Sequence, residues 1–343
     1  MIKQPLIWVL KGARSGDSAQ AIELASRIGP AVVEKQLHFG PLHHVPNFIA
    51  GGGLHGLTTP SRRTLVPPWP DLVVATGRRT APISCWIKQQ LPGKIRNVHL
   101  GRPRMALDRF DLVVTTPQYG LPMQSNVIEM PLPFAHPKPP IASEIEAFAT
   151  LWSNLPRPWI LAVIGGGKFP LRLGDAELSN FGATVDRLAA QLKGSVLLLD
   201  SPRSGEGALQ LVSRAIRRPK WLAVRASTPN PYQAALHLAD QFAVTSDSVS
   251  MITEMLILGP PLHVFKLPSS RLVPRWRARV GLAAMLARQG ILSPPRDVDG
   301  LVQGLLAQGA VGDLAAQIYP QHKLNVEEIQ AAVVRQIKEQ LKP

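Results

Sequence analysis

With 343 residues, 45% of them hydrophobic, the chain is long enough for two domains, and no apolar run reaches the roughly 18 residues of a membrane-spanning helix. Its formal net charge of +15 implies an anionic partner, which we expect to be anionic lipid or a phosphorylated substrate. Nucleic acid is disfavoured because aromatic residues make up only 6% of the chain and no nucleic-acid-binding motif is present.

Apolar runs and helical patterns alternate through the first part of the chain. Strands are predicted at residues 7–10, 72–75, 97–100 and 111–115, and helices at residues 17–28 and 82–90. Buried strands that alternate with helices are typical of parallel α/β units. The single cysteine, Cys85, fits a reducing compartment, and the apolar run near the N-terminus is too short for a secretory signal.

The first predicted strand is followed by a loop that carries candidate ligand groups, namely Gly12, Arg14, Ser15, Gly16 and Asp17. Its glycines permit a tight turn and the close approach of a ligand, although the spacing is not the GxGxxG of a dinucleotide-binding protein. Asp17 stands at the expected helix start, where it is either an N-cap or the general base that activates an acceptor hydroxyl. These roles compete, because a carboxylate that accepts N–H groups is a weaker base.

A second loop, Arg78, Arg79 and Thr80, follows the strand at 72–75 and is either another anion-binding loop or an ordinary basic turn. Residues 131–140 contain five prolines and predict a linker. We therefore place an N-terminal Rossmann-like domain at residues 1–135 and a C-terminal one at residues 136–320. A helix within residues 321–343 is expected to pack back on the N-terminal domain.

The alternation restarts after the proline-rich segment. Strands are predicted at residues 159–164, 196–199, 221–225, 242–244 and 262–266, and helices at residues 180–193, 208–217 and 326–341, with two more that begin near 230 and 247. The expected architecture is α/β, with two doubly wound parallel sheets of the Rossmann type that face a cleft. Ligand loops are expected at the carboxyl ends of the strands.

Two loops of the second half carry candidate groups for a donor diphosphate. These groups are Gly165, Gly166, Gly167 and Lys168 in the first loop, and Ser201, Arg203 and Ser204 in the second. Three glycines expose backbone N–H groups and Lys168 adds a charge, which favours a phosphate cradle, although the Gly-Lys-Ser/Thr of a Walker A loop is missing. The Arg203 guanidinium is either a partner for a diphosphate or a surface group in a turn.

The segment 230–254 is the most informative stretch. It predicts a helix that begins at Asn230 and Tyr232, then a short strand and a hydroxyl-rich turn. Tyr232 is either a core residue or a lid over a nucleotide base. A second helix opens on Asp247, Ser248, Ser250 and Met251, and Glu254 lies about one turn further along.

A helix N-terminus offers backbone N–H groups to a diphosphate, and a carboxylate one turn into the helix can accept hydrogen bonds from a ribose diol. Nucleotide-sugars present both groups. The alternative is a capped core helix, with Asp247 or Ser248 as the cap and Met251 in the core.

These loops carry no DxD motif, and the chain has neither an HExxH nor a CxxC pair, so we expect no metal site. No cofactor is expected either, since a nucleotide-sugar would be the substrate. A basic stretch, Arg271, Arg275, Arg277, Arg279 and Arg288, is interleaved with apolar residues. It suits peripheral contact with an anionic membrane surface, or it is an ordinary solvated amphipathic helix.

Several of these motifs together resemble one family of bacterial and plant proteins. They are GARSGDSAQ at 12–20, PDLVVATGRRTAP at 70–82, FDLVV at 110–114, GGGK at 165–168, SPRS at 201–204, and NPY with VTSDSVSMITE up to Glu254. The chain is identified as similar to the mitochondrial fission, or elongated-mitochondria, family, which resembles GT-B glycosyltransferases. The resemblance implies a donor nucleotide in the C-terminal half, with Glu254 on the ribose and Ser248–Met251 at the diphosphate. It also implies an acceptor near Gly12–Asp17.

Many relatives carry a histidine where Asp17 stands, which leaves the catalytic base open. We predict a metal-independent glycosyltransferase that moves a sugar from a nucleoside-diphosphate donor to a lipid or cell-envelope acceptor. The expected location is cytoplasmic, peripheral at the inner membrane. Two alternatives are a non-catalytic interaction protein that keeps the fold and a nucleotide-sugar epimerase.

Overall fold

The computed structural model describes residues 4–12, 15–167, 169–201, 203–223, 229–270 and 281–342, with the side chains of residues 15–17, 42–43 and 50 left out. The chain divides into two compact units. The first takes in the chain up to His136, the described part of Arg275–Arg296, and Glu327–Pro343. The second takes in the described residues between 137 and 274 together with Asp297–Val326.

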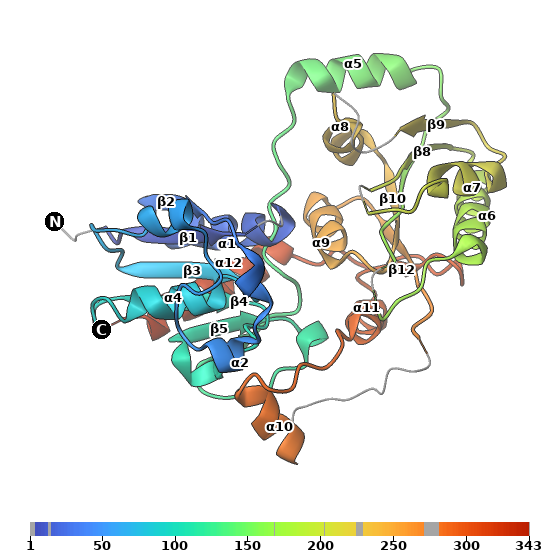
Figure 1. The fold of residues 1–343 in the computed structure, drawn as a ribbon. Coiled ribbons are helices and arrows are strands. Elements are labelled where there is room, and N and C mark those ends of the chain that lie inside the picture. Colours follow the sequence, from blue (N-terminus) through green and yellow to red (C-terminus); the bar gives the residue numbers. More distant parts are fainter. Residues whose placement is uncertain are drawn as a thin grey trace. The chain divides into compact units, whose positions relative to one another are not determined.

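The first unit is built on a six-stranded sheet of order β2-β1-β3-β4-β5-β6, in which every neighbouring pair is parallel (Figure 1). Its strands are β1 (Ile7–Lys11), β2 (Val32–Gln36), β3 (Leu72–Thr76), β4 (Arg96–Leu100), β5 (Leu112–Thr115) and β6 (Val127–Glu129). Its described helices are α1 (Ser15–Ile28), α2 (Asn47–Ala50), α3 (Thr59–Arg63), α4 (Ala81–Lys88), α10 (Gly281–Arg288) and α12 (Val326–Gln340), with 3-10 turns at Pro41–His44, Leu107–Arg109 and Pro117–Tyr119.

The second unit has a parallel six-stranded sheet of order β12-β11-β10-β7-β8-β9. Its strands are β7 (Trp159–Val163), β8 (Ser195–Leu199), β9 (Lys220–Ala223), β10 (Gln241–Thr245), β11 (Leu262–Phe265) and β12 (Gly312–Asp313). Its described helices are α5 (Ala142–Trp152), α6 (Asp175–Leu192), α7 (Ala208–Ala215), α8 (Pro231–Leu238), α9 (Val249–Leu258) and α11 (Val298–Ala307).

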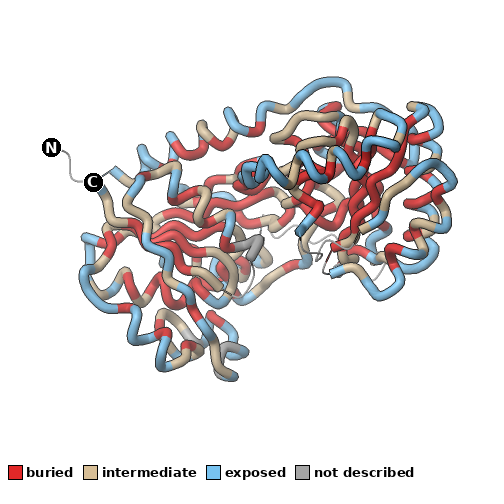
Figure 2. Tube along the Cα trace, turned by 90° about the horizontal axis from the view of Figure 1, so that it is seen from above, coloured by how far each residue is buried: buried red, intermediate tan, exposed pale blue. Residues whose placement is uncertain are grey.

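Helices cover both faces of the first sheet, so its strands are apolar on both sides. Ile7 and Val9 of β1 pack in a cluster with residues of α1 and with Val333 and Ile337 of α12. Trp8 and Leu10, which point to the other face, pack in a cluster with Ile83 and Ile87 of α4. Figure 2 shows the central strands of both sheets as buried. The predicted α/β class with two doubly wound parallel sheets is confirmed.

The proline-rich segment 131–140 contains no helix or strand, as expected, but its first part belongs to the core of the first unit. Leu132 and Phe134 are buried, and Phe134 packs in the same cluster as β1. The Gln330 side-chain amide of α12 donates to the carbonyl groups of Pro133 and Ala135 at 3.4 Å. The tail helix and this segment therefore pack together in the first unit.

Candidate functional site

Each sheet has one topological switch point, which is the place between two neighbouring strands from which the chain adds strands to one side of the sheet and later to the other. In the second sheet this point lies between β7 and β10, because the chain runs from β7 to β8 and β9 on one side and returns to β10 on the other. In the first sheet it lies between β1 and β3. Ligands of open α/β sheets bind beside the carboxyl ends of strands at such points. The predicted loops of both units follow these four strands and β8.

The carboxylate of Asp247 organises the carboxyl end of β10. Its Oδ2 atom accepts hydrogen bonds from the backbone N–H groups of Gly166 and Gly167, at 2.8 and 3.1 Å. Its Oδ1 atom accepts from the Thr245 hydroxyl at 2.7 Å, and the Thr245 oxygen accepts from the N–H of Gly165 at 2.8 Å. The N–H groups predicted to cradle a phosphate are therefore already bound within the unit.

Close approaches explain why this loop consists of glycines. A Cβ atom on Gly165 would lie 2.1 Å from Asp247 Oδ1, and one on Gly166 would lie 2.5 Å from Arg203 Cβ. Gly167 has a φ of +55°, which disfavours other residues, and its Cβ atom would lie 2.6 Å from a neighbouring side chain. The triplet thus allows three loops to pack together, a role that needs no ligand. Lys168 lies outside the described residues.

The loop after β8 forms hydrogen bonds with the loop at the end of β7 and with the residue that begins α9 after β10. The Ser204 hydroxyl lies 2.8 Å from the Gly165 carbonyl oxygen, and the Ser201 N–H donates to Ser204 Oγ at 3.0 Å. The Arg203 N–H donates to Ser201 Oγ at 3.3 Å. The Arg203 guanidinium donates to Ser248 Oγ at 3.4 Å. The structure therefore brings the predicted arginine to the start of α9.

Helix α9 begins at Val249, the residue after Ser248. Ser248 is its N-cap residue and is 5% exposed, and the Ile252 N–H donates to the Ser248 carbonyl as the first intrahelical bond. The N–H groups of the first turn of an α-helix point outward and carry its positive dipole end. Met251 is buried in the core, as the capped-helix alternative expects, while Ser250 is half-buried.

Glu254 lies further along α9 and accepts a hydrogen bond from the Tyr232 hydroxyl at 2.9 Å. Tyr232 is 1% exposed, so it takes the core alternative and presents no ring surface to a nucleotide base. Asn230 Oδ1 accepts from the Tyr232 N–H at 3.0 Å and so caps helix α8. The suggested base contact through Asn230 and Tyr232 therefore has no support from their positions.

The switch point of the first unit brings the loops after β1 and β3 together. A Cβ atom on Gly12 would lie 4.0 Å from Thr80 Cγ2. Thr80 is buried and its hydroxyl donates to the Thr76 carbonyl at 2.7 Å, which makes it a structural residue. Arg79 is exposed, whereas burial and then the charges of Arg104 and Arg79 lower the pKa of Arg78.

Several predicted groups cannot be placed. Arg14 and the arginines between 271 and 279 lie outside the described residues, and so do the side chains of Ser15 and Asp17. The backbone of Ser15, Gly16 and Asp17 forms the first turn of α1, which begins two residues before the predicted start. Asp17 is thus the third residue of the helix and not its N-cap, contrary to the first of its two predicted roles. Asp17 thus remains a predicted base.

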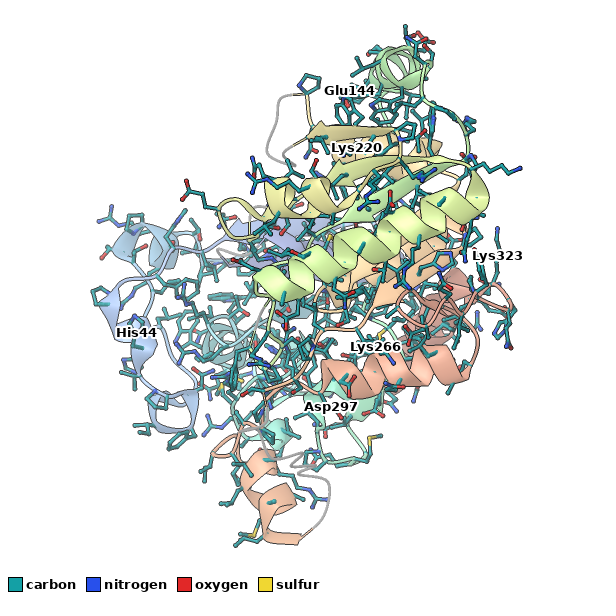
Figure 3. All side chains as sticks on the ribbon, turned by 90° about the vertical axis from the view of Figure 1, so that its right-hand side faces the viewer. His44, Glu144, Lys220, Lys266, Asp297 and Lys323 are labelled. Atoms are coloured by element: carbon teal, nitrogen blue, oxygen red, sulfur yellow. The ribbon has the colours of Figure 1, made fainter. Side chains whose placement is uncertain are left out.

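The chain does contain an Asp-x-Asp triplet, Asp297-Val298-Asp299, outside the loops on which the prediction of no metal rests. Asp297 is the N-cap of α11 and accepts from the Gly300 N–H at 2.8 Å, and Figure 3 labels it at the start of that helix. Among the described residues, no group of three or more His, Cys, Asp or Glu side chains could hold a metal ion. None of the described helices combines the length and apolar character needed to cross a bilayer.

Sequence reasoning missed Thr245 and Asn47. Thr245 stands two residues before Asp247, a spacing typical of local hydrogen bonds between a hydroxyl and a carboxylate. Asn47 is buried, and its amide donates to the carbonyl groups of Arg78 and Pro103 at 2.6 and 2.9 Å. Nothing in the sequence around Asn47 indicates these partners, which lie 31 and 56 residues away.

Comparison with known proteins shows a match between residues 15–335 and the family described as Mitochondrial fission ELM1. The Mitochondrial fission protein ELM1 of Arabidopsis thaliana is 27% identical over 235 residues, which are 61% of this chain and 54% of that protein. This chain therefore spans little more than half the length of that relative.

Two solved structures are also similar. One is a glycosyltransferase from Rickettsia africae ESF-5, with 12% identity and a TM-score of 0.48, covering 98% of this chain and 97% of that chain. The other is the UDP-GlcNAc 2-epimerase from Neisseria meningitidis bound to UDP-GlcNAc, with 12% identity and a TM-score of 0.48, covering 97% of this chain and 99% of that chain. At this identity neither likeness bears on the reaction of this chain.

Proposed function

The chain belongs to the mitochondrial fission ELM1 family, and from this premise we propose that it is a metal-independent glycosyltransferase. It would move a sugar from a nucleoside-diphosphate donor to a lipid or cell-envelope acceptor at the cytoplasmic face of a membrane. The observation that carries the proposal is the contact between Arg203 and Ser248, at the start of α9 and at the switch point of the second sheet.

A guanidinium beside a helix N-terminus suits a diphosphate, because both supply N–H donors and positive charge. The donor diphosphate would therefore lie at the first turn of α9 and not in the glycine triplet, whose N–H groups are bound to Thr245 and Asp247. Arg203, with Lys168 as a further cation, would stabilise the departing nucleoside diphosphate. Glu254 would accept the ribose hydroxyls, and Asp17 would activate the acceptor hydroxyl.

One specific observation favours a second candidate, a non-catalytic interaction protein that keeps the fold. The hydrogen bonds that Asp247 accepts from the glycine loop fill the carboxyl end of β7 with the protein's own carboxylate. Such an edge is stable without a ligand. Nucleotide binding with no sugar transfer to lipid extracts would support this candidate over the transferase.

Glu254→Ala is expected to weaken the binding of nucleoside diphosphates by about 1–3 kcal/mol, the contribution of a charged hydrogen bond, which is roughly 5- to 150-fold in Kd. Isothermal calorimetry would measure this, after a thermal-shift screen of nucleoside diphosphates and their sugars has identified the base. An unchanged affinity in this variant would remove Glu254 from the donor site.

Tyr232→Phe is the matched control for Glu254. It deletes the hydroxyl that donates to Glu254 but keeps the carboxylate. Nucleotide affinity should change little in this variant. If Tyr232→Phe weakens binding as much as Glu254→Ala, Glu254 acts through the packing of α8 against α9 and not on the ligand.

Asp17→Asn is expected to lower turnover by at least about 100-fold, the usual contribution of a general base, and to leave donor affinity unchanged. Asparagine has nearly the same size and shape as aspartate, so the first turn of α1, in which residue 17 stands, should be kept. The measurement is sugar transfer to a membrane lipid extract, with calorimetry of the donor in parallel. Full turnover in this variant would show that Asp17 is not the general base.

A further inference from the structure

Arginine side chains gather around the loop that follows β4 in the first unit. They are Arg78, Arg79, Arg102, Arg104 and Arg296. Burial, followed by the charges of Arg104 and Arg296, lowers the pKa of Arg102 to about 10. Each of these arginines thus lies within electrostatic reach of another.

Arg102 and Arg296 contact neutral groups. Arg102 Nη1 donates to the Pro294 carbonyl at 2.5 Å, and its guanidinium lies 5.7 Å from the centre of the Tyr119 ring. Arg296 Nη1 donates to Gln118 Oε1 at 3.4 Å. Arg102, Arg104 and Arg296 form no ion pair with an acid among the described side chains. Gathering like charges in this way costs free energy that an anion bound from outside would offset.

Helix α10 lies against the same loop and exposes two of its large apolar residues. Its alanines Ala284 and Ala287 are buried, whereas Leu282 is 68% and Met285 55% exposed. Gly290, just after the helix, packs so closely that a Cβ atom there would lie 2.4 Å from the Met105 backbone nitrogen. A helix that buries alanine and exposes leucine and methionine has an apolar face suited to a partner.

Helix α2 provides a second exposed apolar group next to this loop. Asn47 anchors it through hydrogen bonds to the Arg78 and Pro103 carbonyl groups. The two residues that follow, Phe48 and Ile49, are 47% and 67% exposed. Figure 1 shows α2 and α10 on the lower side of the first unit. Exposed apolar side chains and the arginines Arg102, Arg104 and Arg296, which form no ion pair among the described side chains, thus adjoin one loop.

We propose that this surface, defined by Phe48, Ile49, Arg79, Arg104, Leu282 and Met285, docks the first unit on an anionic lipid bilayer. The arginines would contact lipid phosphates, and the apolar side chains would enter the boundary between headgroups and acyl chains. Charge complementarity selects this occupant, because an apolar protein partner would not need the arginines. The net charge of +15 supports the same partner. The inference deepens the membrane part of the proposed function, and its test does not require nucleotide binding.

The test is flotation of the full chain with phosphatidylcholine vesicles that contain or lack phosphatidylglycerol. Binding is expected to need the anionic lipid and to weaken as salt is raised. Arg79→Gln with Arg104→Gln should weaken it by about 25-fold, since each basic residue near such a surface contributes about 5-fold. Leu282→Ser with Met285→Ser should weaken it by about 10-fold or more through lost insertion. All four residues are exposed, so the fold should be kept, which circular dichroism would check.

The second unit offers matched controls. Arg187→Gln with Arg214→Gln removes the same charge from exposed positions of α6 and α7, and Ile141→Ser with Leu151→Ser removes two exposed apolar side chains. Both control pairs should bind anionic vesicles nearly as well as the unchanged protein. The proposal is overturned if a control pair weakens binding as much as its counterpart, or if neutral vesicles bind equally well. It is also overturned if inorganic phosphate displaces the protein at an ionic strength at which chloride does not, because the site would then take free phosphate.

Discussion

Asp247→Ala is expected to lower the free energy of unfolding of the second unit by about 3–5 kcal/mol, because it leaves several buried donors without an acceptor. The carboxylate accepts from two glycine N–H groups and from the Thr245 hydroxyl, and the residue is 5% exposed. Water that enters the gap would restore only part of these bonds. Chemical denaturation followed by tryptophan fluorescence would measure the loss.

Two variants make this result specific. Asp247→Asn keeps one acceptor oxygen in nearly the same volume and should fall between the unchanged protein and the alanine variant. Glu177→Ala removes another carboxylate that accepts a backbone N–H, from Gly174 at 2.9 Å. This hydrogen bond lies at the surface, so its cost should stay within about 1 kcal/mol. If Asp247→Ala unfolds at the same denaturant concentration as the unchanged protein, Asp247 does not hold the loops together.

Nine of the twelve strands could be predicted, because buried parallel strands are continuous apolar runs. The run at 159–164, for example, became β7, and the run at 72–75 became β3. Strands β2, β6 and β12 were missed, and each lies at a sheet edge. The sequence VVEKQ of β2 has no buried side chain, and β6 and β12 have only three and two residues. Helix α6 begins at Asp175, earlier than residue 180, and the Glu177 carboxylate accepts the N–H of its N-cap residue Gly174 at 2.9 Å.

The candidate site could be predicted only as a set of loops. Ser248 and Glu254 were recognised from the strand–turn–helix pattern, which is local. The partners of Asp247 were not, because Gly166 lies 81 residues away along the chain and is brought close by the pairing of β7 with β10. The sequence of a glycine triplet is the same whether its N–H groups bind a phosphate or a carboxylate of the protein. Only the three-dimensional structure distinguishes the two cases.

Lowering the pH from about 8 to about 5 is expected to destabilise each unit by about 2 kcal/mol, because each contains a histidine that is buried in its neutral form. His99 of β4 is fully buried beside Phe110, with no hydrogen-bond partner on either ring nitrogen among the described residues, and burial lowers its pKa to about 3. His263 of β11 is 1% exposed, and burial lowers its pKa to about 4.

The direction follows from the proton balance. In the unfolded chain each imidazole takes up a proton below its usual pKa of 6.5. In the folded protein the imidazole of His263 stays neutral down to a pH of about 4, and that of His99 down to about 3. The stability that neutral histidine provides is therefore complete above 6.5 and is lost as the pH falls toward the folded pKa. The drop from 6.5 to about 5 is worth about 2 kcal/mol per histidine at 1.36 kcal/mol per pH unit.

His99→Leu should remove this pH dependence from the first unit and leave it in the second, since His263 lies in the other unit. The ring nitrogens of His99 have no described partner, so the substitution strands no hydrogen-bonding group. Denaturant unfolding at both pH values, with each unit followed by amide hydrogen exchange, separates the two contributions. His55→Leu removes an exposed ring from the same unit and should keep the full acid sensitivity. If His99→Leu loses as much stability between the two pH values as the unchanged protein does, the acid sensitivity of the first unit arises from other groups.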